Sequence, residues 1–416
     1  MAASTDELTL DETERRAGRL IILGQTSSKL GDLLSNPKTI LTWLMGVVGA
    51  PPALTALLVP IRESGSMLPQ LFVSGLVKQV RRRKFVYAAG AMGQALCLLA
   101  MGLASLYLKG GAAGWAILIS LVFFSLARCL CSIAAKDVLG KAIPKGARGK
   151  ITGTAAAISG VVGLGAALYV MLAVEREASQ ANYAWLILGG SGCFVIAAFL
   201  FGAVPEDQSE KVTRDLAVDL KARLRMVWDD SVLRKFMVTR TLLLGSALGS
   251  PYLVVLSQQE GFALRSLAAF VLAEGLASAL SSRFWGSLSD RSSRRAMMIG
   301  GMLAGGIGLV GSFIAVKAPV LASSLWIWPS LFFLLNLGYA GVRIGRKTYI
   351  IDISGDERRT DYVSASNTVT AVMIIILGAL GAVVQGWGTV AVLGFFSLLC
   401  LFGSASVLGL PRVKAD

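Results

Sequence analysis

Charged side chains lie inside long apolar stretches of this 416-residue chain, where each one needs a partner or water. Arg62 and Glu63 are adjacent, and adjacent residues on a helix do not face each other, so neither satisfies the other. Glu274 is a third such charge, in the second half of the chain. A carboxylate in a low-dielectric cavity can exchange protons near neutral pH, and a neighbouring arginine can bind an anionic group. The three residues therefore predict a cavity that couples protons to a solute, or else a structural bridge between helices.

Further charges present the same choice between chemistry and structure. Lys29 and Asp32 are three residues apart, on one face of a helix, where they could neutralise each other or serve coupling and substrate binding. Arg128 opens the segment RCLCSIAAK, and its functional and structural interpretations have equal weight. Arg240 and Arg343 lie near predicted helix ends, where snorkelling or pairing with a loop is expected.

The composition predicts the elements that hold these charges. Hydrophobic residues make up 55% of the chain and charged residues 16%. A bilayer core needs about 20 apolar residues per helix and cannot satisfy free backbone groups, so the apolar runs predict about twelve membrane-spanning helices. The net charge of +15 comes from short basic loops, which favours membrane orientation over nucleic-acid binding. Five cysteines without a CxxC spacing, and no histidine, predict no disulfide, metal site or cofactor.

A short charged stretch, GSLSDRSSRR, separates two of the apolar runs. Its spacing resembles the loop between the second and third helices in each half of the major facilitator superfamily. In that family the Asp caps a neighbouring helix end and pairs with an Arg, which latches one conformation. The resemblance covers about residues 20–410 and implies an all-α fold, with twelve transmembrane helices in two six-helix bundles around a cavity. The latch residues that it implies are Gly286, Asp290, Arg291, Arg294 and Arg295.

The first half has its own version of this stretch, KQVRRRK, at residues 78–84. Lys78 stands where the Asp would be, so we expect a latch that is weaker or differently built. Asp137 and Asp352 each lie nine residues after an arginine, at the end of the fourth predicted span of a half. Because a basic loop follows each of them, we assign both aspartates to the latch.

Two frames compete for the first two helices. Hydropathy alone favours residues 40–61 as the first span, which would leave Lys29 and Asp32 at the membrane interface. The spacing of the family instead predicts helices at 20–46 and 53–79, joined by an outer turn. We prefer the second frame because it aligns two landmarks of the halves, Gly49 with Gly261 and Arg62 with Glu274.

The predicted organisation has five parts. They are a cytoplasmic tail over 1–19, a six-helix bundle over 20–204, a linker over 205–232, a second six-helix bundle over 233–410 and a tail over 411–416. An amphipathic helix is expected in the linker, where Val212, Leu216, Leu220 and Leu224 repeat every four residues. In the second bundle we expect helices at 264–284, 324–347 and 361–385. The excess of basic residues in the inner loops places both termini in the cytoplasm.

These features predict a secondary active transporter for a small organic solute, anionic or zwitterionic, working by alternating access with proton coupling. Export of a drug-like or amphipathic solute is an alternative, although GVVGLG in the predicted fifth helix lacks the proline of the family's drug antiporters. A receptor, scaffold or lipid mover on the same fold is an alternative of another class. An enzyme is not expected, because the chain has no phosphate loop and no nucleophile with a base. We expect a monomer, with protons, solute and lipid as partners, in a bacterial inner membrane.

Overall fold

The computed structural model describes residues 11–69, 73, 77, 79–144, 147–173, 180–206, 225, 227–261 and 264–412. All regular elements within these ranges are helices. The predicted amphipathic repeat of the linker, and Lys78, lie outside them.

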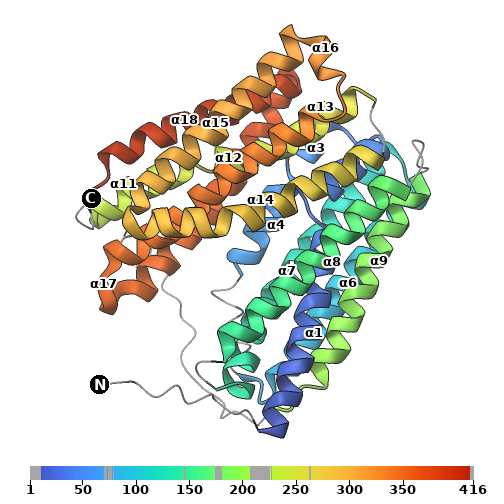
Figure 1. The fold of residues 1–416 in the computed structure, drawn as a ribbon, viewed down its shortest axis with the longest axis vertical. Helices are drawn as coiled ribbons and strands as arrows, with labels where there is room; N and C mark the ends of the chain where they lie inside the picture. The colour runs from blue at the N-terminus through green and yellow to red at the C-terminus, as the bar shows by residue number, and fades with distance from the viewer. Residues whose placement is uncertain are drawn as a thin grey trace.

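Eight helices are described in the first half of the chain, and their bounds come from local sequence; Figure 1 shows their arrangement. At the start of α1 a capping box forms, in which Asp11 Oδ1 accepts from the Glu14 N–H at 2.6 Å. Residues 12–19, which the sequence analysis placed in the N-terminal tail, are therefore helical. Residues 1–10 of that tail lie outside the described residues. The helices are α1 (Glu12–Leu34), α2 (Ile40–Val47), α3 (Pro52–Thr55), α4 (Leu58–Met67), α6 (Arg83–Tyr107), α7 (Gly110–Ala142), α8 (Arg148–Ala173) and α9 (Gln180–Gly202), of which α3 is a single turn.

The first predicted helix, 20–46, is divided in the structure. It ends at Leu34 and resumes at Ile40, because Pro37 has no N–H to continue the hydrogen-bond ladder. The outer turn that follows is where the preferred frame placed it. Gly49 and Gly261 both adopt positive φ, +71° and +80°, at the ends of α2 and α13, which matches the alignment of the two halves.

The second half consists of helices that also break and bend. The span Ser231–Gln259 contains three segments, interrupted near Pro251, and Asp230 caps its start. The elements are α11 (Ser231–Leu242), α12 (Gly245–Leu248), α13 (Ser250–Gln259), α14 (Leu264–Arg291), α15 (Ser293–Lys317), α16 (Pro319–Ala322), α17 (Ile327–Val384), η1 (Gln385–Trp387), α18 (Thr389–Ser406) and η2 (Val407–Gly409).

Two predicted boundaries in this half are wrong. The helix expected at 264–284 continues to Arg291, so most of GSLSDRSSRR is the last two turns of α14 and Ser292 alone separates it from α15. The helices expected at 324–347 and 361–385 are joined in one continuous helix, α17. Its two apolar spans are Ile327–Ser354 and Ala365–Trp387, and Figure 1 shows the ribbon turning between them.

Eight described helices are long and apolar enough to cross a membrane, or nine if the bent α14 is counted as one span. The all-α membrane fold is thus confirmed, while the expected number of twelve is reached only if shorter or more polar helices are included. α1 and α4 are such helices, since they carry Lys29, Asp32, Arg62 and Glu63. Both pack inside the molecule, α1 against α8 and α9, and α4 against α7 and α17.

The two halves meet near the glycine turns and diverge toward the opposite end, where α17 turns (Figure 1). We call the first of these the turn end and the second the charged end, which carries residues 286–295. At the turn end Gln258 Nε2 donates to the Trp43 carbonyl at 2.8 Å. Further in, the Ser64 hydroxyl donates to the Ala371 carbonyl at 2.8 Å, and a Cβ on Gly378 would lie 2.2 Å from Pro60 Cγ. The seam between α4 and α17 is therefore closely packed, because a side chain at position 378 would clash with Pro60.

Candidate functional site

The first part of the site is an ion cluster around Asp32 of α1. Arg62 Nη2 of α4 lies 2.7 Å from Asp32 Oδ1, and Arg128 Nη1 of α7 bonds the same oxygen. Three helices from the first half therefore converge on one carboxylate. The sequence suggested Lys29 as the neutralising partner, but the salt bridges to Asp32 from described residues come from the two arginines.

Arg62 is held at its position by burial and an aromatic ring. Its exposed fraction is 7%, and its guanidinium carbon lies 4.5 Å from the centroid of the Phe124 ring on α7. Asp32 is more accessible, with 24% of its side chain exposed, and Arg128 more still, at 36%. The cluster thus has a buried arginine behind it and a partly accessible face in front.

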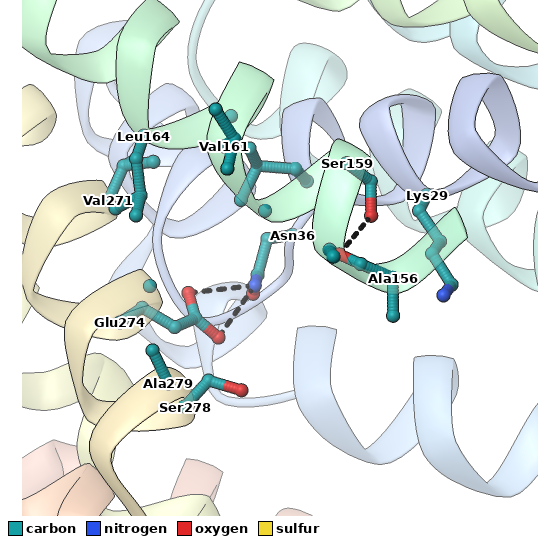
Figure 2. Close-up of a pocket in the computed structure, with 15 residues that line it drawn as sticks. Lys29, Asn36, Ala156, Ser159, Val161, Leu164, Val271, Glu274, Ser278 and Ala279 are labelled. Atoms are coloured by element: carbon teal, nitrogen blue, oxygen red, sulfur yellow. Dashed lines mark hydrogen bonds between the residues drawn. The ribbon is translucent and has the colours of Figure 1, made fainter. Parts of the chain in front are cut away.

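The second part of the site is a cavity of about 710 Å³ between the two halves, lined by α1, α8 and α14. Glu274 of α14 lies on its wall, and both of its carboxylate oxygens accept from Asn36 Nδ2 at 2.9 Å. Figure 2 shows this contact, with the Lys29 ammonium on the far side of the lining. Much of the remaining wall is small or apolar, including Gly160, Val161 and Val271.

The predicted set of Arg62, Glu63 and Glu274 is divided between these two parts. Arg62 bonds Asp32, whereas Glu274 bonds Asn36 across the interface between the halves. Glu63 is half-buried, and no salt bridge joins it to a described residue. Its charge acts on both Arg62 and Arg128, so it belongs electrostatically to the ion cluster.

Two site residues were missed by the sequence analysis, and both depend on the break after α1. Asn36 and Lys38 lie in the break, where the chain leaves α1 and can reach the second half. Lys38 is 7% exposed, and its ammonium stands 3.7 Å from the centroid of the Tyr339 ring on α17. Pro37 was the available signal, because a proline within an apolar run marks a helix break that can expose polar groups.

The prediction of snorkelling for Arg240 is wrong. Its exposed fraction is 6%, and its guanidinium donates to the Ser366 hydroxyl and, at 3.1 Å, to Asn367 Oδ1 on α17. Arg343 is half-buried and stands over the Tyr339 ring, 5.8 Å from the centroid. Both arginines therefore point into the protein and not toward a helix end.

At the charged end, the first half contains a connected set of ion pairs. Arg83 Nη1 at the start of α6 lies 2.8 Å from Asp137 Oδ2 at the end of α7. Glu206 accepts from the backbone N–H groups of Arg83 and Lys84, at 3.1 and 2.8 Å, so it caps α6. Lys141 Nζ lies 3.2 Å from the same carboxylate. Asp137 and Glu206 are thus the acids at this end of the first half, and a latch role for Asp137 stays a prediction.

The contacts at the charged end of the second half are different. Asp290 and Arg291 are exposed at the end of α14, and no salt bridge joins either to a described residue. The Ser293 hydroxyl at the start of α15 lies 3.5 Å from Asp352 Oδ2, where Arg83 meets Asp137 in the first half. The other members of the stretch are Gly286, half-buried, Arg295, exposed, and Arg294, which donates to the Leu408 carbonyl at 3.1 Å.

Chemically, Lys29 from the first half and Glu274 from the second place charged groups on the wall of a cavity between two helix bundles. That is the general plan of a secondary transporter, in which two repeated halves close on a site near the middle of the membrane.

Comparison with known proteins agrees with this fold. Residues 250–415 match the model of the Major Facilitator Superfamily. A D-xylose–proton symporter has TM-score 0.71 and 11% identity over 97% of this chain and 99% of its own. The nucleoside transporter NupG has TM-score 0.70 and 11% identity over 96% and 100%. A POT family transporter in complex with 5-aminolevulinic acid has TM-score 0.71 and 9% identity over 96% and 97%. No curated protein matches the sequence.

The chain therefore has the fold of the major facilitator superfamily throughout, and its second half matches that family in sequence. The resemblance first seen at residues 286–295 is confirmed. The chain is a multi-pass integral membrane protein.

Proposed function

We propose that this protein is a secondary active transporter that moves a small anionic or zwitterionic solute by alternating access, driven by protons. One observation carries the proposal. Glu274 lines a cavity between the halves, and its carboxylate is held by the neutral amide of Asn36 from the opposite half. The hydrogen bonds between Asn36 and Glu274 join the two halves, so they depend on the relative orientation of the halves. Alternating access changes that orientation.

Glu274 and Asp32 are suited to different roles. Two arginines bond Asp32, so adding a proton there would leave two positive charges with less compensation. The hydrogen-bond partner of Glu274 is an uncharged amide, which tolerates either protonation state of the acid, and the positive charges of Lys38 and Arg343 act on it without a salt bridge. We therefore assign proton exchange to Glu274, with Glu63 as a second candidate, and the fixing of Arg62 and Arg128 to Asp32.

The solute would enter from the charged end, which we place in the cytoplasm with both termini, in a bacterial inner membrane. Lys29 supplies a positive charge on the cavity wall. Arg128 belongs to the ion cluster and not to this wall, and 36% of its side chain is exposed. A monomer is sufficient, because both halves of the site come from one chain.

Uptake into proteoliposomes under an imposed pH gradient tests the proposal. Glu274→Gln should abolish gradient-driven uptake, because it keeps the hydrogen-bonding shape and removes the proton. Glu63→Gln tests the second candidate in the same way. Glu260→Gln is the matched control, since Glu260 is exposed at the turn end. Coupling by these acids is excluded if Glu274→Gln and Glu63→Gln both transport as well as Glu260→Gln.

The apolar part of the cavity wall favours a second candidate, export of an amphipathic solute. Leu33, Val161, Leu164 and Val271 line the same space as Glu274. In this case amphipathic compounds should compete with labelled solute in proteoliposomes, and small hydrophilic anions should not.

A further inference from the structure

Four basic side chains gather in the second half of the chain. Arg343, Arg346 and Lys347 are three and four residues apart, so they share one face of α17. Arg240 approaches from α11, close enough for its charge to act on both Arg346 and Lys347. No salt bridge joins any of the four to an acidic residue in the part of the chain that the structure describes. We call these four residues the basic cluster.

Arg240 is the deepest member of the basic cluster. It is 6% exposed, its described partners are the neutral oxygens of Ser366 and Asn367, and its Nε has no hydrogen-bond partner. A buried charge without an opposite charge is strongly unfavourable, and neutral oxygens compensate only part of it. In contrast, the buried Arg62 has Asp32. Arg240 is therefore a fixed positive charge whose compensation is missing from the described chain.

The other members of the basic cluster are reachable. Lys347 is exposed, and Arg343 and Arg346 are half-buried. Arg343 shares the Tyr339 ring with Lys38, which comes from the break between α1 and α2 in the first half. A ligand at the basic cluster would thus sit beside a contact between the two halves, on the elements that must move relative to each other in transport.

We propose that the basic cluster binds a dianionic phosphate group, so that the solute of this protein is a phosphate monoester or phosphate itself. This proposal rests on the transporter function proposed above and names the class of its substrate. Guanidinium groups present paired N–H donors that match phosphate oxygens, and the Lys347 ammonium adds a point charge. Glu274 of the cavity wall is a described acid whose charge acts on Arg343, and the four basic side chains still leave an excess of positive charge. A dianion balances that excess better than a monocarboxylate does. The phosphate of an anionic lipid offers the same chemistry from another source.

Calorimetric titration of inorganic phosphate into the full-length protein tests this proposal. The protein is held in nanodiscs of zwitterionic lipid, and succinate and acetate serve as comparison anions. Phosphate should bind, and more tightly than acetate. Arg346→Gln should weaken phosphate binding about tenfold or more, the equivalent of losing one charge-assisted contact. Lys235→Gln should leave it unchanged, because Lys235 is an exposed basic residue on α11 outside the cluster.

Three results would overturn the proposal. The first is that phosphate does not bind the wild-type protein. The second is that Arg346→Gln binds phosphate as tightly as Lys235→Gln does. Succinate binding more tightly than phosphate would assign the site to dicarboxylates. Repeating the titration in nanodiscs of anionic lipid separates the two phosphate sources. Unchanged phosphate binding supports a soluble substrate, whereas its loss assigns the basic cluster to lipid headgroups.

The same variants separate this proposal from the transporter function. Phosphate binding without pH-driven phosphate uptake by the wild type would contradict the transporter function and leave the site standing. Proton-driven uptake of other solutes by Arg346→Gln at the wild-type rate, in a protein that does not bind phosphate, would contradict the site alone.

Discussion

The two halves of this protein share a helix plan but distribute charge differently. In the first half Asp32 pairs with the buried Arg62 and the partly exposed Arg128. In the second half Arg240 is equally buried and bonds neutral side chains. Arg62 aligns with Glu274, so even the aligned position carries opposite signs. The buried arginine of the first half is therefore balanced by a carboxylate, whereas that of the second half is bonded by neutral side chains.

The largest expected effect follows from breaking the Asp32 cluster. Asp32→Ala leaves Arg62 buried without its acid, which we expect to lower stability by about 2–3 kcal/mol. Breaking a fully buried pair costs about 3–5 kcal/mol, and we reduce this because Asp32 is partly exposed. Thermal unfolding of the detergent-purified protein measures it. Glu274→Gln is the comparison in the other half and should change stability little. Equal losses in both variants would contradict the contrast between the halves.

A smaller loss is expected at the charged end of the first half. Glu206→Gln removes the salt bridge to Lys141 and weakens the cap on α6, together about 1–2 kcal/mol. Limited proteolysis after Arg82 and Arg83 should become faster, as the start of α6 frays. The matched substitution in the second half is Ser293→Ala, which removes only a 3.5 Å contact to Asp352. Its effect should be below about 0.5 kcal/mol. A larger effect for Ser293→Ala would show that the second-half contact is the stronger one.

The glycine turns should respond alike in both halves. Gly49→Ala and Gly261→Ala each place a side chain at positive φ, with no atom within 4 Å of the new Cβ. Backbone strain alone should lower stability, by about 1 kcal/mol in each case. The measurement is the shift in thermal midpoint for each variant against wild type. A difference of more than about twofold between the two shifts would show that the turns are not equivalent.

The fold was predictable from the sequence because it depends on averaged properties. Apolar runs and the charged stretch at 286–295 indicated the helical membrane fold, and Gly49 and Gly261 set the frame of the first two helices. Exact helix ends were less predictable. The stretch at 286–295 is polar enough to be a loop, yet its serines, arginines and aspartate continue α14 to Arg291, where Ser292 can cap α15.

The site was predictable in its members but not in its partners. Asp32, Arg62, Arg128 and Glu274 were all selected from their depth in apolar runs. Which acid meets which base depends on how helices far apart in sequence rotate against each other, and one sequence does not contain that. The break at Pro37 shows the limit most clearly. It turns Asn36 and Lys38 toward the second half, so a feature that interrupts a helix supplies contacts that a continuous helix would lack.

The seam between α4 and α17 has a consequence for how fast the molecule can cycle. Ser64 donates to a backbone carbonyl there, and the ring of Pro60 occupies the space that any side chain on position 378 would need. Opening the turn end must therefore separate a proline from a glycine and release a backbone oxygen into a nearly dry environment. In the proposed alternating access, the lack of a side chain at Gly378 is therefore what lets α17 close against Pro60.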